Sequence, residues 1–186
     1  VNVIKDEGDP DARRLYKMVY NPFHNGKFTI RTATSPDGIH WTASDSYPLD
    51  EFFEQASFFK HNGLYVIHGQ AVECGEGGGQ RGRQGYAWVS PDFVTWLPAI
   101  AEAFSLPEPS TAEDRGLLKP YDQVHLGVGG ASRGNVVVGL YGLWHNAPPK
   151  QPGRNVPDNW FGYETTSCDL GLVVSNDGLH FREPVK

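Results

Sequence analysis

Short runs in which apolar and polar residues alternate follow one another along most of this chain. The clearest are residues 14–20 (RLYKMVY), 64–71 (LYVIHGQA) and 135–144 (NVVVGLYGLW). Alternation of this kind is typical of half-buried β-strands, because successive side chains of a strand point to opposite faces. Groups of Gly, Pro, Asn and Asp separate the runs, and no long run has the period of a helix. The pattern therefore predicts an all-β fold.

A polar corner occurs three times between these runs. It reads SPDGIHW at residues 35–41, SPDFVTW at 90–96 and SNDGLHF at 175–181. In each copy the Asp can accept hydrogen bonds from nearby backbone amides, and Gly tolerates the left-handed conformation that closes a tight turn. The aromatic residue at the end starts the next strand. A strand-rich unit that repeats in this way indicates blades or an array of sheets.

Each unit has room for four short strands joined by turns, which is the make-up of one propeller blade. We expect blades at roughly residues 1–48, 49–105 and 121–186, so that the whole chain, 1–186, forms about three blades. In the third unit the glycine-rich residues 129–134 are expected to form a turn between two strands. The predicted fold class is thus all-β, a β-propeller of four-stranded antiparallel blades.

Composition narrows the range of ligands. The 186 residues carry a formal net charge of −6 with a pI near 5.6, which argues against nucleic acid or an anionic membrane surface as partner. The two cysteines, Cys74 and Cys168, lie in different repeats and have no metal-binding spacing. The sequence contains no Walker, zinc or serine-hydrolase motif, so we expect no cofactor and no metal. A neutral ligand is the expected partner.

The candidate chemistry lies at the start of two strands. The first strand of the second unit begins with Glu54 and Gln55, and that of the third begins with Asp122 and Gln123. The first strand of each blade lines the central channel of a propeller, so these side chains are expected to converge. Cleavage of a glycosidic bond needs one carboxyl group to protonate the leaving oxygen and another to attack or to activate water. We therefore expect Glu54 and Asp122 to be catalytic and the two amides to contact a carbohydrate.

Other residues are weaker candidates. Glu73 and Asp169 are secondary candidates for the acid or base, and the candidates for substrate binding are His125, Trp144 and Trp160. An aromatic face suits the apolar face of a pyranose. Two alternatives remain open. Acids at strand starts also cap turns or pair with a nearby Arg, and a non-catalytic propeller could bind a glycan or a protein through the same funnel.

Three segments resemble a known family. They are residues 35–41, 58–66 (FFKHNGLYV) and 169–181 (DLGLVVSNDGLHF), which are similar to the five-bladed β-propeller glycosidases of glycoside hydrolase families 32 and 43. The resemblance covers most of the chain as a blade pattern. It implies three channel acids on the first strands of successive blades: a nucleophile or base, a transition-state stabiliser in an Arg-Asp-Pro motif, and a general acid Glu. By blade position Glu54 would correspond to the stabiliser and Asp122 to the general acid.

The chain departs from the family's pattern at both positions. Residues 54–56 (EQA) stand where the family has Arg-Asp-Pro, and an Asp takes the place of the acid Glu. Residues 73–74 resemble the Glu-Cys of family 32 but follow a second strand rather than opening a blade. The equivalent position in the first unit would precede Val1. Because five blades need more than three units, we expect a part of a longer protein or a ring completed by another copy.

Overall fold

Strands form almost all of the regular structure of this chain. The computed structural model describes residues 1–49, 53–71, 84–98, 123–145 and 167–184. Within these residues the only helix is a single 3₁₀ turn, η1, at Ala12–Arg14. The all-β prediction is confirmed.

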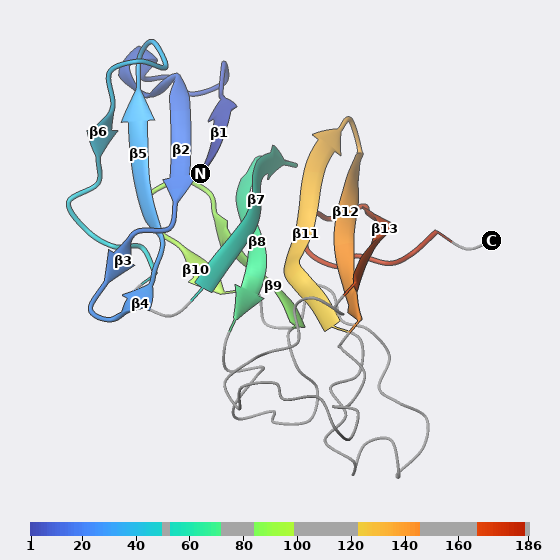
Figure 1. The fold of residues 1–186 in the computed structure, drawn as a ribbon. Coiled ribbons are helices and arrows are strands. Elements are labelled where there is room, and N and C mark those ends of the chain that lie inside the picture. Colours follow the sequence, from blue (N-terminus) through green and yellow to red (C-terminus); the bar gives the residue numbers. More distant parts are fainter. Residues whose placement is uncertain (50–52, 72–83, 99–122, 146–166, 185–186) are drawn as a thin grey trace.

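Three antiparallel sheets follow one another along the chain (Figure 1). The first has the order β1-β2-β5-β6, the second β10-β9-β8-β7 and the third β11-β12-β13. A small hairpin, β3–β4, is inserted in the first unit. The strands of the first unit are β1 (Asn2–Lys5), β2 (Tyr16–Tyr20), β3 (Phe23–His24), β4 (Lys27–Phe28), β5 (Arg31–Ser35) and β6 (Thr42–Ala43). Those of the second are β7 (Phe53–His61), β8 (Leu64–Ala71), β9 (Gln84–Ser90) and β10 (Leu97–Pro98), and those of the third are β11 (Gln123–Arg133), β12 (Val136–His145) and β13 (Ser167–Ser175).

The three polar corners have the same hydrogen bonding. In each, the Asp carboxylate accepts bonds of 2.7–2.8 Å from the backbone N–H groups two and three residues further along. Gly38 and Gly178 have φ of +77°, and Phe93 takes the left-handed conformation at the matching place with φ of +65°. The corners are therefore one local structure used three times, as the sequence predicts. The carboxylates belong to Asp37, Asp92 and Asp177.

The prediction of a turn at residues 129–134 is wrong. β11 continues to Arg133, and the turn to β12 follows at Gly134, where φ is +64°. Gly130, within the expected turn, is needed for packing instead. A Cβ on Gly130 would lie only 2.9 Å from the ring of Phe59, which comes from the neighbouring sheet. The glycine is needed for that approach rather than for a turn.

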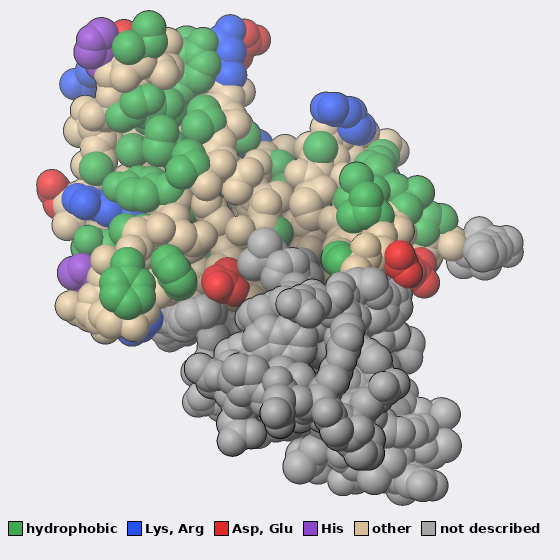
Figure 2. All heavy atoms as spheres, viewed as in Figure 1, with side chains coloured by type: hydrophobic (Ala, Val, Ile, Leu, Met, Phe, Trp, Pro, Cys, Tyr) green, Lys and Arg blue, Asp and Glu red, His purple; other side chains and the backbone are tan. Residues whose placement is uncertain are grey.

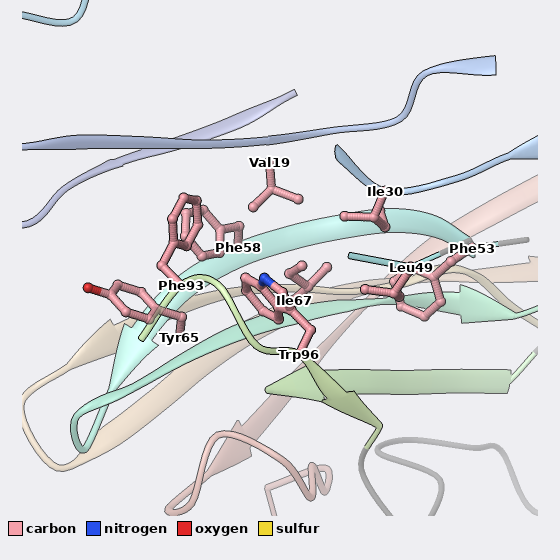
Figure 3. Packing of buried hydrophobic residues seen from close by; sticks show 9 residues of the cluster. All are labelled: Val19, Ile30, Leu49, Phe53, Phe58, Tyr65, Ile67, Phe93 and Trp96. Atoms are coloured by element: carbon pink, nitrogen blue, oxygen red, sulfur yellow. The ribbon is translucent and has the colours of Figure 1, made fainter. Parts of the chain in front are cut away.

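The sheets stack face to face on two hydrophobic clusters. The first sheet packs on the second through the nine residues shown in Figure 3, among them Val19, Phe58 and Trp96. The second packs on the third through Phe59 and Val66 on one side and, on the other, residues such as Val137. Strand β7 lies beside both β1 and β11, so the first strands of the three sheets are neighbours.

A buried cluster of charges also joins the first two sheets. Lys17 is fully buried, and its Nζ lies 3.2 Å from Asp6 Oδ2 and 2.8 Å from Asp9 Oδ2. From the second sheet, Lys60 Nζ lies 2.9 Å from Asp6 Oδ2 and the hydroxyl of Tyr65 donates to the same carboxylate. Because Lys60 and Tyr65 belong to the second sheet, the carboxylate of Asp6 receives all of these hydrogen bonds only when the two sheets are docked.

The pKa of Asp6 reflects this network. Burial by itself raises it, but hydrogen bonds from Tyr65, Lys60 and Lys17 outweigh burial and hold the pKa of Asp6 well below its usual range. A carboxyl group whose pKa is lower in the folded state stabilises the fold above its unfolded pKa, which is about 4. That contribution is lost as the pH falls below about 4.

We expect Asp6→Asn to lower the free energy of unfolding at pH 7 by about 3 kcal/mol, at the lower end for a buried ion pair because Asp9 still faces Lys17. The variant should also lose less stability than the wild type between about pH 4 and pH 2. Urea denaturation across this pH range measures both effects. Glu7→Gln, which breaks an exposed pair with Lys5, is the control and should change the stability little, because water screens an exposed ion pair. Equal effects of the two substitutions would contradict the role given to the buried network.

In the third sheet the substitution Gly171→Ala should be destabilising. A Cβ there would lie 2.0 Å from the ring of Tyr141, which is buried and whose hydroxyl donates to Glu183 at 2.5 Å. Overpacking of this kind costs about 1–3 kcal/mol. Gly129→Ala is the matched control, because its Cβ would meet only the Leu140 carbonyl oxygen at 3.5 Å. Urea denaturation of both variants should show a clear loss for the first and little change for the second.

Candidate active site

The predicted site lies where two neighbouring first strands begin. β7 and β11 run side by side and start at the same end of the molecule (Figure 1). Each is interrupted near its start by a bulge, between Gln55 and Ser57 in β7 and between His125 and Val128 in β11. A bulge bends a strand and re-aims the side chains before it, and bulges are common next to active sites.

Glu54 stands just before the bulge of β7. Its side chain is half-buried and accepts a hydrogen bond from Nε2 of Gln70, which lies directly opposite on β8. Gln70 is itself buried. No Lys or Arg among the described residues forms an ion pair with Glu54. The carboxylate is thus oriented by a neutral donor, which leaves its charge available.

Gln55 and Asn21 fix the start of β7 against the first sheet. The Gln55 side chain donates from Nε2 to the Val19 carbonyl oxygen at 3.0 Å, and its backbone N–H donates to Asn21 Oδ1 at 3.1 Å. Asn21 Nδ2 in turn donates to the Phe53 carbonyl oxygen at 2.6 Å. The sequence alone indicates only a turn at Asn21, because its partners on β7 lie more than thirty residues further on.

Two of three successive residues of β8 join the second sheet to the third. Nδ1 of His68 accepts a hydrogen bond of 2.9 Å from the backbone N–H of Val128, the first paired residue after the bulge of β11. The Val128 carbonyl oxygen accepts a bond of 2.7 Å from Ser57 Oγ. Gly69 and Gly127 meet backbone to backbone, since a Cβ on Gly127 would lie 2.9 Å from Gly69. The third residue of the segment is Gln70, which holds Glu54.

His68 is neutral in the folded protein. Complete burial lowers the pKa of His68 to about 3. Because Nδ1 accepts a hydrogen bond, the proton sits on Nε2, which has no hydrogen-bond partner among the described residues. The ring of Phe181 lies edge to face with the imidazole at 5.2 Å between centroids. His68 thus serves as an acceptor that anchors β11.

Strand pairing aligns Glu54 with a different residue of the third unit than the sequence suggests. Glu54 pairs with Gln70 and His125 pairs with Gly142, and each partner stands six residues after the first residue of its own strand. The bulge of β7 adds one residue, whereas that of β11 adds two. The backbone position equivalent to Glu54 is therefore that of His125.

The other predicted site residues are distributed as follows. Asp122, Glu73 and Trp160 lie outside the described residues. Gln123 pairs with Trp144 across β11 and β12. Asp169 is exposed on β13, the strand of the third sheet that is separated from β11 by β12.

The described residues contain no group of three His, Cys, Asp or Glu side chains that could hold a metal ion. They also contain no helix with the length and hydrophobicity needed to cross a membrane.

The substitution His68→Leu tests the anchoring of β11. It removes the acceptor of the Val128 N–H, and a buried donor left unpaired costs about 1–3 kcal/mol. His68→Asn offers an oxygen near the position of Nδ1 and should recover part of this loss. Urea denaturation at pH 7 compares the two. A leucine variant as stable as the wild type would show that this hydrogen bond does not hold β11.

The same residue predicts a pH dependence. In the unfolded chain a His takes up a proton below its ordinary pKa of about 6.5, whereas buried His68 does not. The wild type should therefore lose stability as the pH falls from about 6.5 towards the folded-state value. This part of the loss should be absent in His68→Asn, as urea denaturation at several pH values would show.

No protein-family model matches this chain, and no curated protein matches it. Solved structures do. The sucrose-6-phosphate hydrolase from Lactobacillus gasseri is 15% identical with a TM-score of 0.53, over 90% of this chain and 30% of that one. An α-L-arabinofuranosidase from Fusarium graminearum is 10% identical with a TM-score of 0.53, over 91% and 44%. A further glycoside hydrolase is 11% identical with a TM-score of 0.54, over 90% and 47%.

This chain thus spans less than half the length of each of these structures. Identities this low establish the fold alone. The resemblance that the corner motifs and strand pattern predict is confirmed at that level: the chain has the fold of a part of the propeller glycoside hydrolases.

Proposed function

We propose that this chain is part of a carbohydrate-active hydrolase in which Glu54 is one of the channel carboxylates. The observation that carries the proposal is the setting of Glu54. It stands at the start of the first strand of its sheet, half-buried beside a bulge, and its only described partner is the amide of Gln70. A carboxylate with no structural ion pair, in the fold of glycoside hydrolases, is suited to chemistry.

The proposal includes a five-bladed propeller as the architecture of the whole protein. The three described sheets would be three blades, with β1, β7 and β11 lining the channel. The neighbouring positions of these first strands support this arrangement. The share of the solved glycoside hydrolases that the chain covers, between 30% and 47%, leaves room for further blades.

In the proposed mechanism two carboxyl groups divide the work. An ionised Glu54 would stabilise positive charge on the sugar ring, attack it or activate water, while Asp122 would protonate the leaving oxygen. The neutral Gln70 orients Glu54 and does not cancel its charge, as an Arg or Lys would. Gln123, His125, Trp144 and Trp160 remain proposed substrate contacts. Glu73 and Asp169 remain secondary candidates for the acid or base.

Gln55 enters the proposal in a positioning role. Its Nε2 donates to the Val19 carbonyl oxygen, and its Oε1 is buried with no hydrogen-bond partner among the described residues, so neither atom is open to a ligand. Together with Asn21 it holds the start of β7 in place. That placement determines where the neighbouring carboxylate of Glu54 lies.

The test is the hydrolysis of a panel of aryl glycosides by the full chain and its carboxylate variants. Glu54→Gln and Asp122→Asn should each lower kcat by about 10²–10⁴-fold if these groups do acid–base work. Asp45→Asn, an exposed carboxylate of the first unit, is the control and should leave kcat unchanged. Full activity in both amide variants would remove the assignment. Glycan binding without turnover, unaffected by either substitution, would instead favour a non-catalytic binding propeller.

A further inference from the structure

A groove runs between the outer strands of the first two units. It lies between β5 and β6 of the first sheet and the corner that follows β9, Arg14 also lines it, and its volume is about 230 Å³. Figure 2 shows apolar side chains gathered over β12 and β13, on a face that a further blade of the proposed propeller would cover. The groove differs from such a face, because the two sheets that enclose it are both described.

Four hydroxyl side chains follow one face of the first sheet along this groove. Thr34 on β5 pairs with Thr42 on β6. Because successive side chains of a strand alternate between its faces, Thr32 and Ser44 occupy the neighbouring positions on the same face. Val19, which pairs with Thr32, belongs to the cluster that packs on the second sheet. The hydroxyl groups are thus on the side of the first sheet that faces the second.

Three of these hydroxyl groups form no hydrogen bond with any residue that the structure describes. They belong to Thr32, Thr34 and Thr42. Thr32 is the clearest case, because the residue is only 4% exposed. A buried hydroxyl group without a hydrogen bond is unfavourable unless water or a ligand supplies the partner. The groove therefore presents unused donors and acceptors at fixed positions on two paired strands.

The polar lining is not required for the stacking of sheets. Alignment of the first two units by their corner serines, Ser35 and Ser90, shows that apolar residues of the second sheet occupy the positions of the three threonines. These residues are Ala87, Val89 and Leu97. Ala87 belongs to the cluster between the second and third sheets, and Val89 packs against it. The hydroxyl groups are therefore a particular feature of the first unit.

The opposite wall of the groove is the corner at residues 90–96, where Phe93 and Val94 line it. Phe93 stands where the other two corners have Gly38 and Gly178, and it takes a φ of +65°. This conformation is costly for a bulky side chain, and such strain is common at binding sites. Val94 is 67% exposed. The corner of the second unit thus departs from the repeat where it faces the groove, and it provides an apolar wall opposite the hydroxyl groups.

Arg14 connects the two walls. Its Nη2 donates to the Asp92 carbonyl oxygen of the corner at 2.7 Å, and its Nε lies 3.4 Å from Asp9 Oδ2. The carboxylate of Asp9 offsets charge on the guanidinium group, which favours a ligand without net charge. Nη1 of Arg14 forms no hydrogen bond with a described residue, so it can donate to such a ligand.

The groove is separate from the candidate active site. β7 and β9 begin at the same end of the second sheet, where Phe53 and Gln84 both pair with Ala71. Glu54 lies at that end, whereas the corner at residues 90–96 follows the last residue of β9. The groove is therefore at the opposite end of the sheet, beside its outer strands.

We propose that this groove is a second carbohydrate-binding site, which takes one neutral sugar unit and has no part in cleavage. The threonine hydroxyl groups and Arg14 bond the sugar hydroxyl groups, and the wall at Phe93 and Val94 contacts the apolar C–H groups of the ring. The volume lies below the about 300–1,000 Å³ that is usual for drug-sized ligands, which suits a single sugar unit. The proposal does not depend on Glu54 being catalytic.

Titration of the full chain with methyl glycosides of glucose, galactose, mannose and arabinose, followed by the NMR shifts of backbone amides, tests the site. We expect at least one glycoside to shift the amides of residues 32–34, 42–44 and 93–94. Thr34→Val with Thr42→Val removes two hydroxyl groups and nearly preserves the side-chain shape, so it should weaken this binding at least about tenfold. Thr34→Ser with Thr42→Ser keeps the hydroxyl groups and is the matched control, which should bind nearly as the wild type does.

Glu54→Gln separates the groove from the candidate active site. It should leave the shifts at the groove unchanged, whereas its effect on the hydrolysis of aryl glycosides concerns the proposed function alone. Unshifted amides elsewhere in the valine variant would show that it is folded.

Three outcomes would overturn the proposal. The first is that no glycoside shifts the amides of the groove, or that the shifts are confined to residues near Glu54. The second is a valine variant that binds as tightly as the wild type. The third is a shift of the groove amides by sodium sulfate but by none of the glycosides, which would indicate an anion site at Arg14.

Discussion

A β-sheet has two faces, and the way in which each sheet of this chain covers the face of the next determines its architecture. The sheets are small, with three or four strands each, so none of them has a core of its own. Among the described residues the two clusters of buried hydrophobic side chains both lie between sheets, on either side of the second unit. The positions of the first strands β1, β7 and β11, and with them that of Glu54, follow from this stacking.

At the contact between the second and third sheets, three successive residues of β8 each have a different role. In the segment from His68 to Gln70, one residue accepts the backbone N–H of β11, the next meets the β11 backbone without a side chain, and the third orients Glu54. The same short segment of β8 therefore supports the third sheet and orients the carboxylate of Glu54. This coupling explains why a buried imidazole and a glycine stand next to the candidate site.

The sequence was a good guide to features that depend on neighbours in the chain. Alternation predicted the strand from Leu64 to Ala71, and the three corners formed as the Ser-x-Asp pattern indicated. The sequence was a poor guide where a feature depends on a contact with another sheet. The sequence predicts that Gly130 is part of a turn, but the ring of Phe59 requires a glycine there, and no local pattern indicates that contact.

The candidate site also combines features that neighbouring residues determine with features that depend on distant parts of the chain. That a polar acid opens the first strand of the second unit is visible in the sequence, but its alignment with the third unit is not. The alignment depends on the lengths of two bulges, and these differ by one residue. The hydrogen bonds of Asn21 to β7 are invisible for the same reason, since they join residues more than thirty positions apart.

Lys17 has a consequence for the order of the sheets. At its position the second and third units have Val66 and Val138, so the repeat carries a cation in one copy only. A sheet lacking the counterparts of Lys60 and Tyr65 would leave Asp6, the carboxylate beside Lys17, buried without the hydrogen bonds that these two side chains donate. The buried charges of the first unit therefore favour the second sheet as its neighbour, because another sheet of the repeat in that place would lack these donors.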